Sequence, residues 1–157
     1  MRYLLFLLLV LTLFLPAQTE GIHWMSFTDA MAKRDKAPKK IFIDMYTDWC
    51  GWCKKMDAET FSNSYLAKYL NDNYYLVKLD AESKEPLEYK GKEFRYVRTS
   101  KGGHHELAEE LLRGHLSFPS LVFLDENMEM IQPIPGYRDA EELLIISAYF
   151  GTGKYKE

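Results

Sequence analysis

Residues 44–54 read DMYTDWCGWCK and contain Cys50 and Cys53, the only two cysteines among 157 residues. The preceding run, Ile41–Tyr46, is rich in strand-forming residues and is interrupted by one charge, Asp44. Such a run predicts a strand that is buried on both faces of a sheet. Thr47–Trp49 predicts a turn, so that Cys50 stands where a helix is expected to begin.

The short spacing of the two cysteines indicates a thiol–disulfide switch. A disulfide between residues three apart closes a very small loop and adds little stability. At a helix N-terminus the dipole and the free backbone N–H groups lower a thiol pKa from about 8.5 towards about 7 or below. We therefore expect Cys50 to attack a substrate disulfide, and the more shielded Cys53 to release the mixed disulfide.

Asp44 is a carboxylate in an apolar strand, six residues before Cys50. Burial there is expected to raise its pKa. The group could then take the proton of Cys53, directly or through a water, when the mixed disulfide is resolved. The alternative is an aspartate at a strand end that reaches solvent.

The rest of the chain alternates helices and strands. Ser26 is expected to cap a helix, and Asp139 with Glu142 forms a capping-box pattern ahead of the last one. Early alternation implies parallel strands with crossover helices, and a late hairpin adds an antiparallel edge. The fold class is therefore α/β, with a central mixed sheet flanked by helices. The expected helices are 27–36, 107–113 and 139–150, with one starting at Cys50 and a second piece near 61–70; the strands are 41–46, 74–80, 120–125 and 128–132.

Residues 84–103 do not fit a minimal version of this layout. They carry six basic and three acidic residues, and a hairpin is expected between Leu87–Tyr89 and Phe94–Val97. We interpret the segment as a solvated surface insertion rather than a partner-binding loop, because loops tolerate such additions.

Composition limits the class of protein. Apolar residues make up 47% and charged residues 27%, which is a globular balance and suits one domain. Twenty basic against 23 acidic residues give a net charge of -3, so no basic field for nucleic acid is expected.

The first 17 residues, MRYLLFLLLVLTLFLPA, have the layout of a secretory signal peptide. The expected cut follows Ala17 and leaves a domain of residues 18–157. The apolar run is shorter than the roughly 20 residues of a spanning helix, although an uncleaved anchor remains the alternative. An exported protein meets oxidising surroundings, periplasmic or extracellular, where cysteine pairs form disulfides.

The stretch Asp44–Lys54 resembles the active-site strand, turn and helix of the thioredoxin superfamily. It is most similar to exported thioredoxin-like proteins and to the C-terminal domain of the bacterial membrane disulfide-interchange reductase. Gly114–Ser120 (GHLSFPS) resembles the loop whose cis-proline opposes the cysteines, and Gly136 matches a later family glycine. The resemblance covers about residues 22–150 apart from the insertion, and it implies a thioredoxin fold.

The resemblance also implies roles for single residues. Cys50 would be the nucleophile, Cys53 the resolving thiol and Asp44 the buried proton acceptor. Pro119 would be cis, with Phe118 offering backbone groups to an extended substrate. Gly51 and Trp52 stand where thioredoxins typically have Gly-Pro.

The remaining candidates are neighbours of the cysteines. Trp49 and Trp52 are expected to form an apolar rim against a partner, with packing beside the strand as the alternative for Trp49. With Gly51, Phe118 and Pro119 they form the expected substrate-binding set. Lys78 could face Asp44 across the sheet, but a solvated lysine is the preferred interpretation.

Other chemistries fit less well. Residue 54 is lysine where haem attachment needs histidine, and His104 and His105 lack zinc-finger spacing. Position 109 is glutamate where a zinc-protease helix needs histidine. We expect no metal site and no cofactor beyond the Cys50–Cys53 pair, although Cu(I) could bind the thiolates.

We therefore expect a monomeric thiol–disulfide oxidoreductase that reduces protein disulfides outside the cytoplasm. Its expected partners are exported proteins with disulfides and a membrane thiol reductant, and no nucleic acid. Two alternatives remain open: a disulfide oxidase or isomerase, and a non-enzymatic module that binds a metal or a partner through the cysteines.

Overall fold

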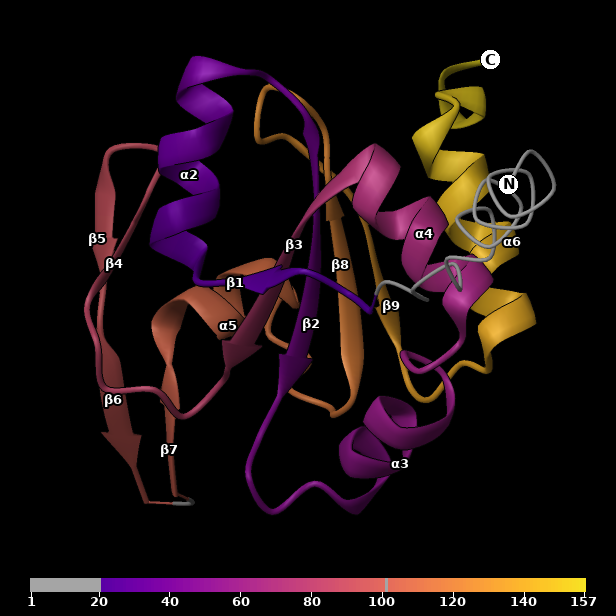
Figure 1. The fold of residues 1–157 in the computed structure, drawn as a ribbon. Helices are drawn as coiled ribbons and strands as arrows, with labels where there is room; N and C mark the ends of the chain where they lie inside the picture. The colour runs from indigo at the N-terminus through magenta and orange to yellow at the C-terminus, as the bar shows by residue number, and fades with distance from the viewer. Residues whose placement is uncertain (1–20, 101) are drawn as a thin grey trace, which may run out of the picture.

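The computed structural model describes residues 21–100 and 102–157 (Figure 1). The expected signal peptide, residues 1–17, and the domain boundary at residue 18 lie outside the described residues. None of the helices in the described part is long and apolar enough to cross a membrane.

Five strands form the central sheet in the order β1-β3-β2-β8-β9. β3 pairs in parallel with β1 and β2, whereas β8 runs antiparallel to β2 and β9 antiparallel to β8. The expected mixed sheet is therefore confirmed. The strands are β1 (Trp24–Met25), β2 (Lys40–Tyr46), β3 (Tyr74–Asp80), β8 (Ser120–Leu124) and β9 (Met130–Pro135).

Helices cover both faces of this sheet (Figure 1). α2 and α5 pack on one face with Ile41, Ile43 and Met45, and α3, α4 and α6 pack on the other with Phe42. Successive residues of β2 thus enter opposite cores, which is why this strand is apolar almost throughout. The helices are α2 (Phe27–Lys36), α3 (Gly51–Glu59), α4 (Ser64–Asn73), α5 (Glu106–Leu111) and α6 (Ala140–Gly151), followed by the 3₁₀ turn η2 (Lys154–Lys156).

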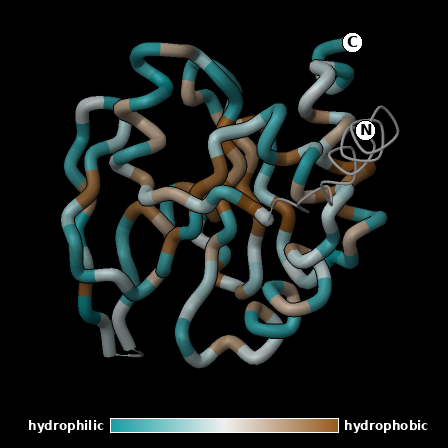
Figure 2. The backbone as a smooth tube through the Cα atoms, in the orientation of Figure 1, coloured by the Kyte–Doolittle hydropathy of each residue, from teal (hydrophilic) through white to brown (hydrophobic). Residues whose placement is uncertain are grey.

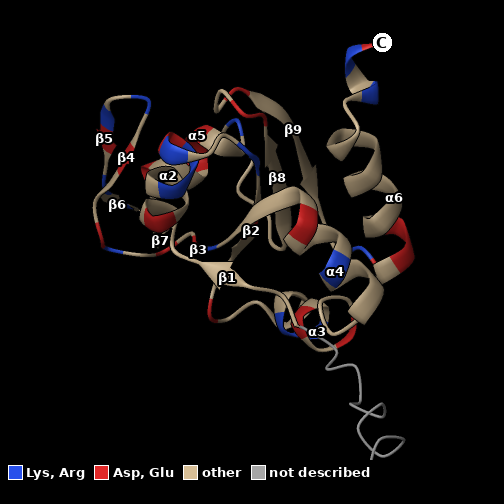
Figure 3. Ribbon diagram, turned by 45° about the horizontal axis from the view of Figure 1, so that its top comes forward, with Lys and Arg blue, Asp and Glu red and all other residues tan. Residues whose placement is uncertain are grey.

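Apolar segments of the chain gather in the central strands, and the outer helices and loops are more polar (Figure 2). Lys, Arg, Asp and Glu lie on the helices, the loops and the outer hairpins and at a few positions of β2 and β3, whereas β8 and β9 are free of them (Figure 3). Both expected helix caps are present: Ser26 accepts the Asp29 N–H at 3.0 Å, and Asp139 with Glu142 forms the capping box.

Several expectations about the elements were wrong, and α4 runs from Ser64 to Asn73 rather than near 61–70. β1 was missed, because its two residues are too few to show a strand pattern in the sequence. The last strand begins at Met130 rather than Met128, since Asp125 Oδ1 accepts the N–H groups of Asn127 and Glu129 and extends the turn. α5 ends at Leu111 rather than Arg113, which has a φ of 52°.

The insertion forms two hairpins instead of the single one expected. β4 (Leu87–Tyr89) pairs with β5 (Lys92–Phe94), because Lys90 and Gly91, with φ of 52° and 74°, form a two-residue turn. β6 (Tyr96–Thr99) pairs with β7 (Gly102–His105). Leu87, Tyr89 and Phe94 are buried in the same core as α2 and α5, so the segment is an integral part of the fold rather than a solvated addition.

Candidate active site

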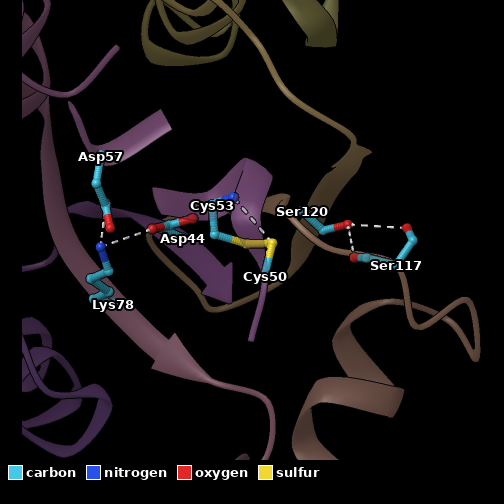
Figure 4. The surroundings of a disulfide bond; sticks show 7 residues. All are labelled: Asp44, Cys50, Cys53, Asp57, Lys78, Ser117 and Ser120. Atoms are coloured by element: carbon cyan, nitrogen blue, oxygen red, sulfur yellow. Dashed lines mark hydrogen bonds and ion pairs between the residues drawn. A yellow bond between two sulfur atoms is a disulfide. The ribbon is translucent and has the colours of Figure 1, made fainter. Parts of the chain in front are cut away.

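Cys50 is the residue that caps α3, and the two cysteines form a disulfide (Figure 4). The buried strand β2 ends at Tyr46, and the Cys50 N–H donates to the Thr47 carbonyl at 3.1 Å, which shapes the turn. Cys50 Sγ in turn accepts the backbone N–H of Cys53 at 3.1 Å. An N–H group directed at this sulfur, at the positive end of a helix, favours a thiolate once the disulfide is reduced.

The two cysteines are equally buried, each with 4% of its surface exposed. The expectation that Cys53 is the more shielded residue was therefore wrong for the oxidised chain. What distinguishes the two is position: Cys50 lies at the helix end, and Cys53 lies within the first turn of α3. The N-cap position is the property that suits Cys50 to act as the nucleophile.

Asp44 lies behind the cysteines on β2 and is almost fully buried, with 2% exposed. Burial is the main cause that raises the pKa of its carboxyl from 3.8 to about 7; the Asp57 carboxylate raises this pKa further, and Lys78 lowers it. Among the described residues, Asp44 Oδ1 has no hydrogen-bond partner. The expected buried carboxyl is confirmed, and an aspartate that reaches solvent is excluded.

Lys78 faces Asp44, and the expected solvated lysine was wrong. The parallel register pairs the two residues directly, and Lys78 Nζ lies 3.6 Å from Asp44 Oδ2. The ammonium also forms an ion pair with Asp57 on α3 (Figure 4). It lies over the rings of Tyr46 and Trp24, at 5.2 and 5.6 Å from their centroids, so its stem is covered by aromatic surface.

Asp57 is the site residue that sequence reasoning missed. It lies four residues after Cys53, which is one helical turn along α3, so it projects from the same side of the helix. That spacing from Cys53 could have identified it. Lys78 is consequently shared between two carboxylates, one buried and one 40% exposed.

The loop before β8 faces the active-site turn from the other side. The Phe118–Pro119 peptide bond is cis, and the Pro119 carbonyl accepts the Gly136 N–H at 2.8 Å. The Phe118 ring meets the Trp49 ring edge to face at 6.0 Å. The fold thus brings together the active-site turn and the cis-proline loop, the two segments identified by the resemblance, although they are about 70 residues apart in the chain. Ser117 and Ser120 lie on this side of the disulfide, and Asp44 lies on the opposite side (Figure 4).

Both flanking tryptophans are exposed, Trp49 by 66% and Trp52 by 58%. Trp49 Nε1 donates to Glu82 at 2.9 Å, and its ring is not packed away beside the strand. Trp52 lies against Tyr137 with a centroid distance of 5.5 Å. A Cβ built on Gly51 would meet nothing within 4 Å among the described residues, so this position is open to solvent.

The two histidines of β7 have other partners. His104 bonds to Glu109 at 3.0 Å, and the buried His105 bonds to the Glu85 carbonyl and accepts the Leu107 N–H. Within residues 21–100 and 102–157, no group of three or more His, Cys, Asp or Glu side chains could hold a metal ion.

With this fold, the cysteine pair at a helix N-terminus and the buried carboxyl behind it have the arrangement of a thioredoxin-like active site. The profile of the Thioredox_DsbH family, described as "Protein of unknown function, DUF255", matches residues 12–129. The chain therefore belongs to this family.

Curated relatives are consistent with that membership. An "Uncharacterized protein B0495.5" of Caenorhabditis elegans is 32% identical over 83 residues, which are 52% of this chain and 11% of that protein. "Disulfide bond reductase DsbH" of Chlamydia pneumoniae is 28% identical over 115 residues, which are 70% of this chain and 60% of that protein. The chain thus spans only about a tenth of the first of these relatives.

Solved structures confirm the fold. A "putative disulphide-isomerase from Bacteroides thetaiotaomicron" has a TM-score of 0.58 at 28% identity, covering 87% of this chain and 97% of that chain. A structure titled "DsbH Oxidoreductase" has a TM-score of 0.59 at 19% identity, covering 88% and 90%.

Proposed function

We propose that this protein reduces disulfides of exported proteins outside the cytoplasm. The observation that carries the proposal is the Cys50–Cys53 disulfide at the N-terminus of α3, with the buried Asp44 carboxyl behind it. A pair whose members are only three residues apart adds little to stability, and this one has the surroundings that a reversible dithiol needs. The reducing direction is supported by the name of the Chlamydia pneumoniae relative, a disulfide bond reductase.

The reaction begins with the reduced protein. The Cys50 thiolate attacks one sulfur of a client disulfide, which forms a mixed disulfide and releases the other client sulfur as a thiolate. Cys53 loses its proton to Asp44, attacks Cys50 Sγ and releases the second client sulfur. The client gains two electrons and two protons, and the protein ends as the disulfide that the structure shows. A membrane thiol reductant is proposed to restore the dithiol.

Export is proposed from residues 1–17, whose charged start, apolar core and terminal Ala17 have the layout of a signal peptide. Mass measurement of the protein recovered outside the cytoplasm tests this. A mature chain that starts at Gln18 supports cleavage, and an intact Met1 in membranes supports an anchor.

The reduction potential of the Cys50–Cys53 pair tests the direction. A value of about -270 mV supports a reductant, and one of about -120 mV supports an oxidase. Trapping tests the reaction itself: Cys53→Ser should accumulate mixed disulfides with client proteins through Cys50, and the matched Cys50→Ser control should not. If the wild-type protein does not reduce insulin and Cys53→Ser traps no partner, the chain is a binding module rather than an enzyme.

A further inference from the structure

A groove beside the disulfide connects the active site to the insertion. It has a volume of about 460 Å³, which lies in the range of ligand-binding pockets. Trp49, Leu116 and Phe118 line it from the active-site turn and the loop before β8, and Thr99, Gly102, Gly103 and His104 line it from hairpin β6–β7. In Figure 1 this hairpin and the turn from β2 to α3 extend to the same end of the molecule.

The groove is continuous with the catalytic pair. Trp49 directly precedes Cys50, and Phe118 directly precedes Pro119, so the apolar wall begins at the two segments that flank the disulfide. Leu116 adds apolar surface, with 36% of the residue exposed. Whatever presents a disulfide to Cys50 therefore brings its neighbouring residues to this wall.

Glu82 is the one acidic side chain among the described residues that line the groove, and His104, which bonds to Glu109, also lines it. Glu82 accepts the Trp49 Nε1–H, which fixes its carboxylate next to the indole. Asp80 lies beside Glu82, because Asp80 Oδ1 accepts the Glu82 backbone N–H at 2.9 Å, and burial together with the charges of Asp48 and Glu82 raises the pKa of Asp80. A cationic side chain suits this end of the groove, and an acidic one does not.

We propose that hairpin β6–β7 and Trp49 hold the client segment next to its disulfide, with an apolar side chain against Trp49, Leu116 and Phe118 and a Lys or Arg side chain against Glu82. This rests on the proposed function, and it gives the insertion a role in selecting substrates. The reaction remains the exchange written above: the client disulfide gains two electrons and two protons as the protein's dithiol becomes its disulfide.

Single-turnover reduction tests the selection without an external reductant. The full chain is reduced, freed of reductant and mixed with one of two synthetic peptides, each with one intramolecular disulfide and a leucine beside it. The peptides differ only in having an arginine or a glutamate next to that leucine. Bis(2-hydroxyethyl) disulfide, which is too small to reach the hairpin, supplies a reference rate for every variant, and quenched samples are analysed by mass.

We expect the wild type to reduce the arginine peptide about threefold faster than the glutamate peptide, as is typical of one exposed ion pair, and this preference should fall with salt. Glu82→Gln should bring the ratio close to one, and Glu82→Lys should invert it. Leu116→Ala should lower both peptide rates relative to the small disulfide. Asp72→Asn on α4 and Ile145→Ala on α6, exposed residues outside the groove, are the matched controls and should keep wild-type ratios.

The outcomes separate the two proposals. If the reduced wild type exchanges with none of the three disulfides, the proposed function fails. If it reduces all three but peptide charge has no effect, or if both Glu82 variants keep the wild-type ratio, the groove proposal fails alone. Circular dichroism of each variant establishes that it is folded before the rates are compared.

Discussion

The buried carboxyl of Asp44 makes the stability of the oxidised protein depend on pH. Its pKa is about 7 in the folded chain, against an ordinary value of 3.8. Between these values the unfolded chain is ionised at Asp44 and the folded chain is not, so each pH unit lowers the free energy of unfolding by about 1.4 kcal/mol. The stabilising contribution is complete below about pH 4 and is lost by about pH 7, a total of about 4 kcal/mol.

Asp44→Asn removes the titrating group and keeps the shape of the side chain. We expect the free energy of unfolding of this variant not to fall between about pH 4 and about pH 7 as it does in the wild type. A buried amide without partners costs about 1–3 kcal/mol at every pH, so the variant should be less stable than the wild type below about pH 4. The difference between the two proteins should then shift by about 4 kcal/mol in favour of the variant by about pH 7.5.

The assay is urea unfolding at half-unit steps of pH, followed by tryptophan fluorescence with the disulfide intact. Asp72→Asn is the matched control, because Asp72 is exposed and its Oδ2 forms a surface ion pair with Lys68 Nζ at 2.8 Å. An exposed pair contributes about 0–1 kcal/mol and cannot produce the same shift. Curves for the wild type and Asp44→Asn that stay parallel within about 1 kcal/mol would refute the assignment of Asp44 as the buried titrating group.

Two further changes test neighbouring interactions. Asp57→Asn should lower the pKa of Asp44, because it removes a carboxylate that raises this pKa and leaves the Lys78 ammonium to Asp44 alone. Carboxyl NMR titration measures the shift. An unchanged titration midpoint for Asp44 would contradict the arrangement in which Lys78 pairs with both carboxylates. Asp139→Ala should cost about 1 kcal/mol through loss of the capping box, seen as a fall of about 2–4 °C in the melting temperature, and a change within error would show that the cap is dispensable.

Much of the fold follows from sequence because local and long-range preferences agree. The β2 run is apolar on both faces, as a central strand between two helical layers must be, and its prediction needed no knowledge of its partners. The caps at Ser26 and Asp139 depend only on residues within one turn. Both classes of feature are short-range, so a single sequence is sufficient to identify them.

What sequence did not predict depends on register and on tertiary packing. The two residues of β1 are too few to show a period, and they are a strand only because β3 lies beside them. Lys78 reads as a solvated lysine until the parallel register places it opposite Asp44. His105 lies in a polar segment, yet it is buried, because its two ring nitrogens form hydrogen bonds with the Glu85 carbonyl and the Leu107 N–H.

Lys78 forms ion pairs with both Asp44 and Asp57, and this arrangement affects how well Asp44 can accept the proton of Cys53. A base for the Cys53 thiol, whose ordinary pKa is about 8.5, must itself have a pKa close to that of the thiol or the proton transfer is steeply uphill. If Lys78 paired with Asp44 alone, it would lower the pKa of that carboxyl towards the ordinary acid range. Burial raises the pKa of Asp44 most, and the Asp57 carboxylate, which also pairs with the ammonium, raises it further, so this pKa stays at about 7.

The same arrangement gives a reason for the Asp44 carboxyl, which is unfavourable for the stability of the fold when it is ionised. Ionised Asp44 lowers the stability of the fold at neutral pH, and its Oδ1 has no hydrogen-bond partner among the described residues to offset that cost. A residue selected for stability alone would be apolar at this position, as its neighbours Ile43 and Met45 on β2 are. We propose that Asp44 serves proton transfer with Cys53, and that Asp57, on the helix that carries both cysteines, adds to the effect of burial on the affinity of Asp44 for that proton.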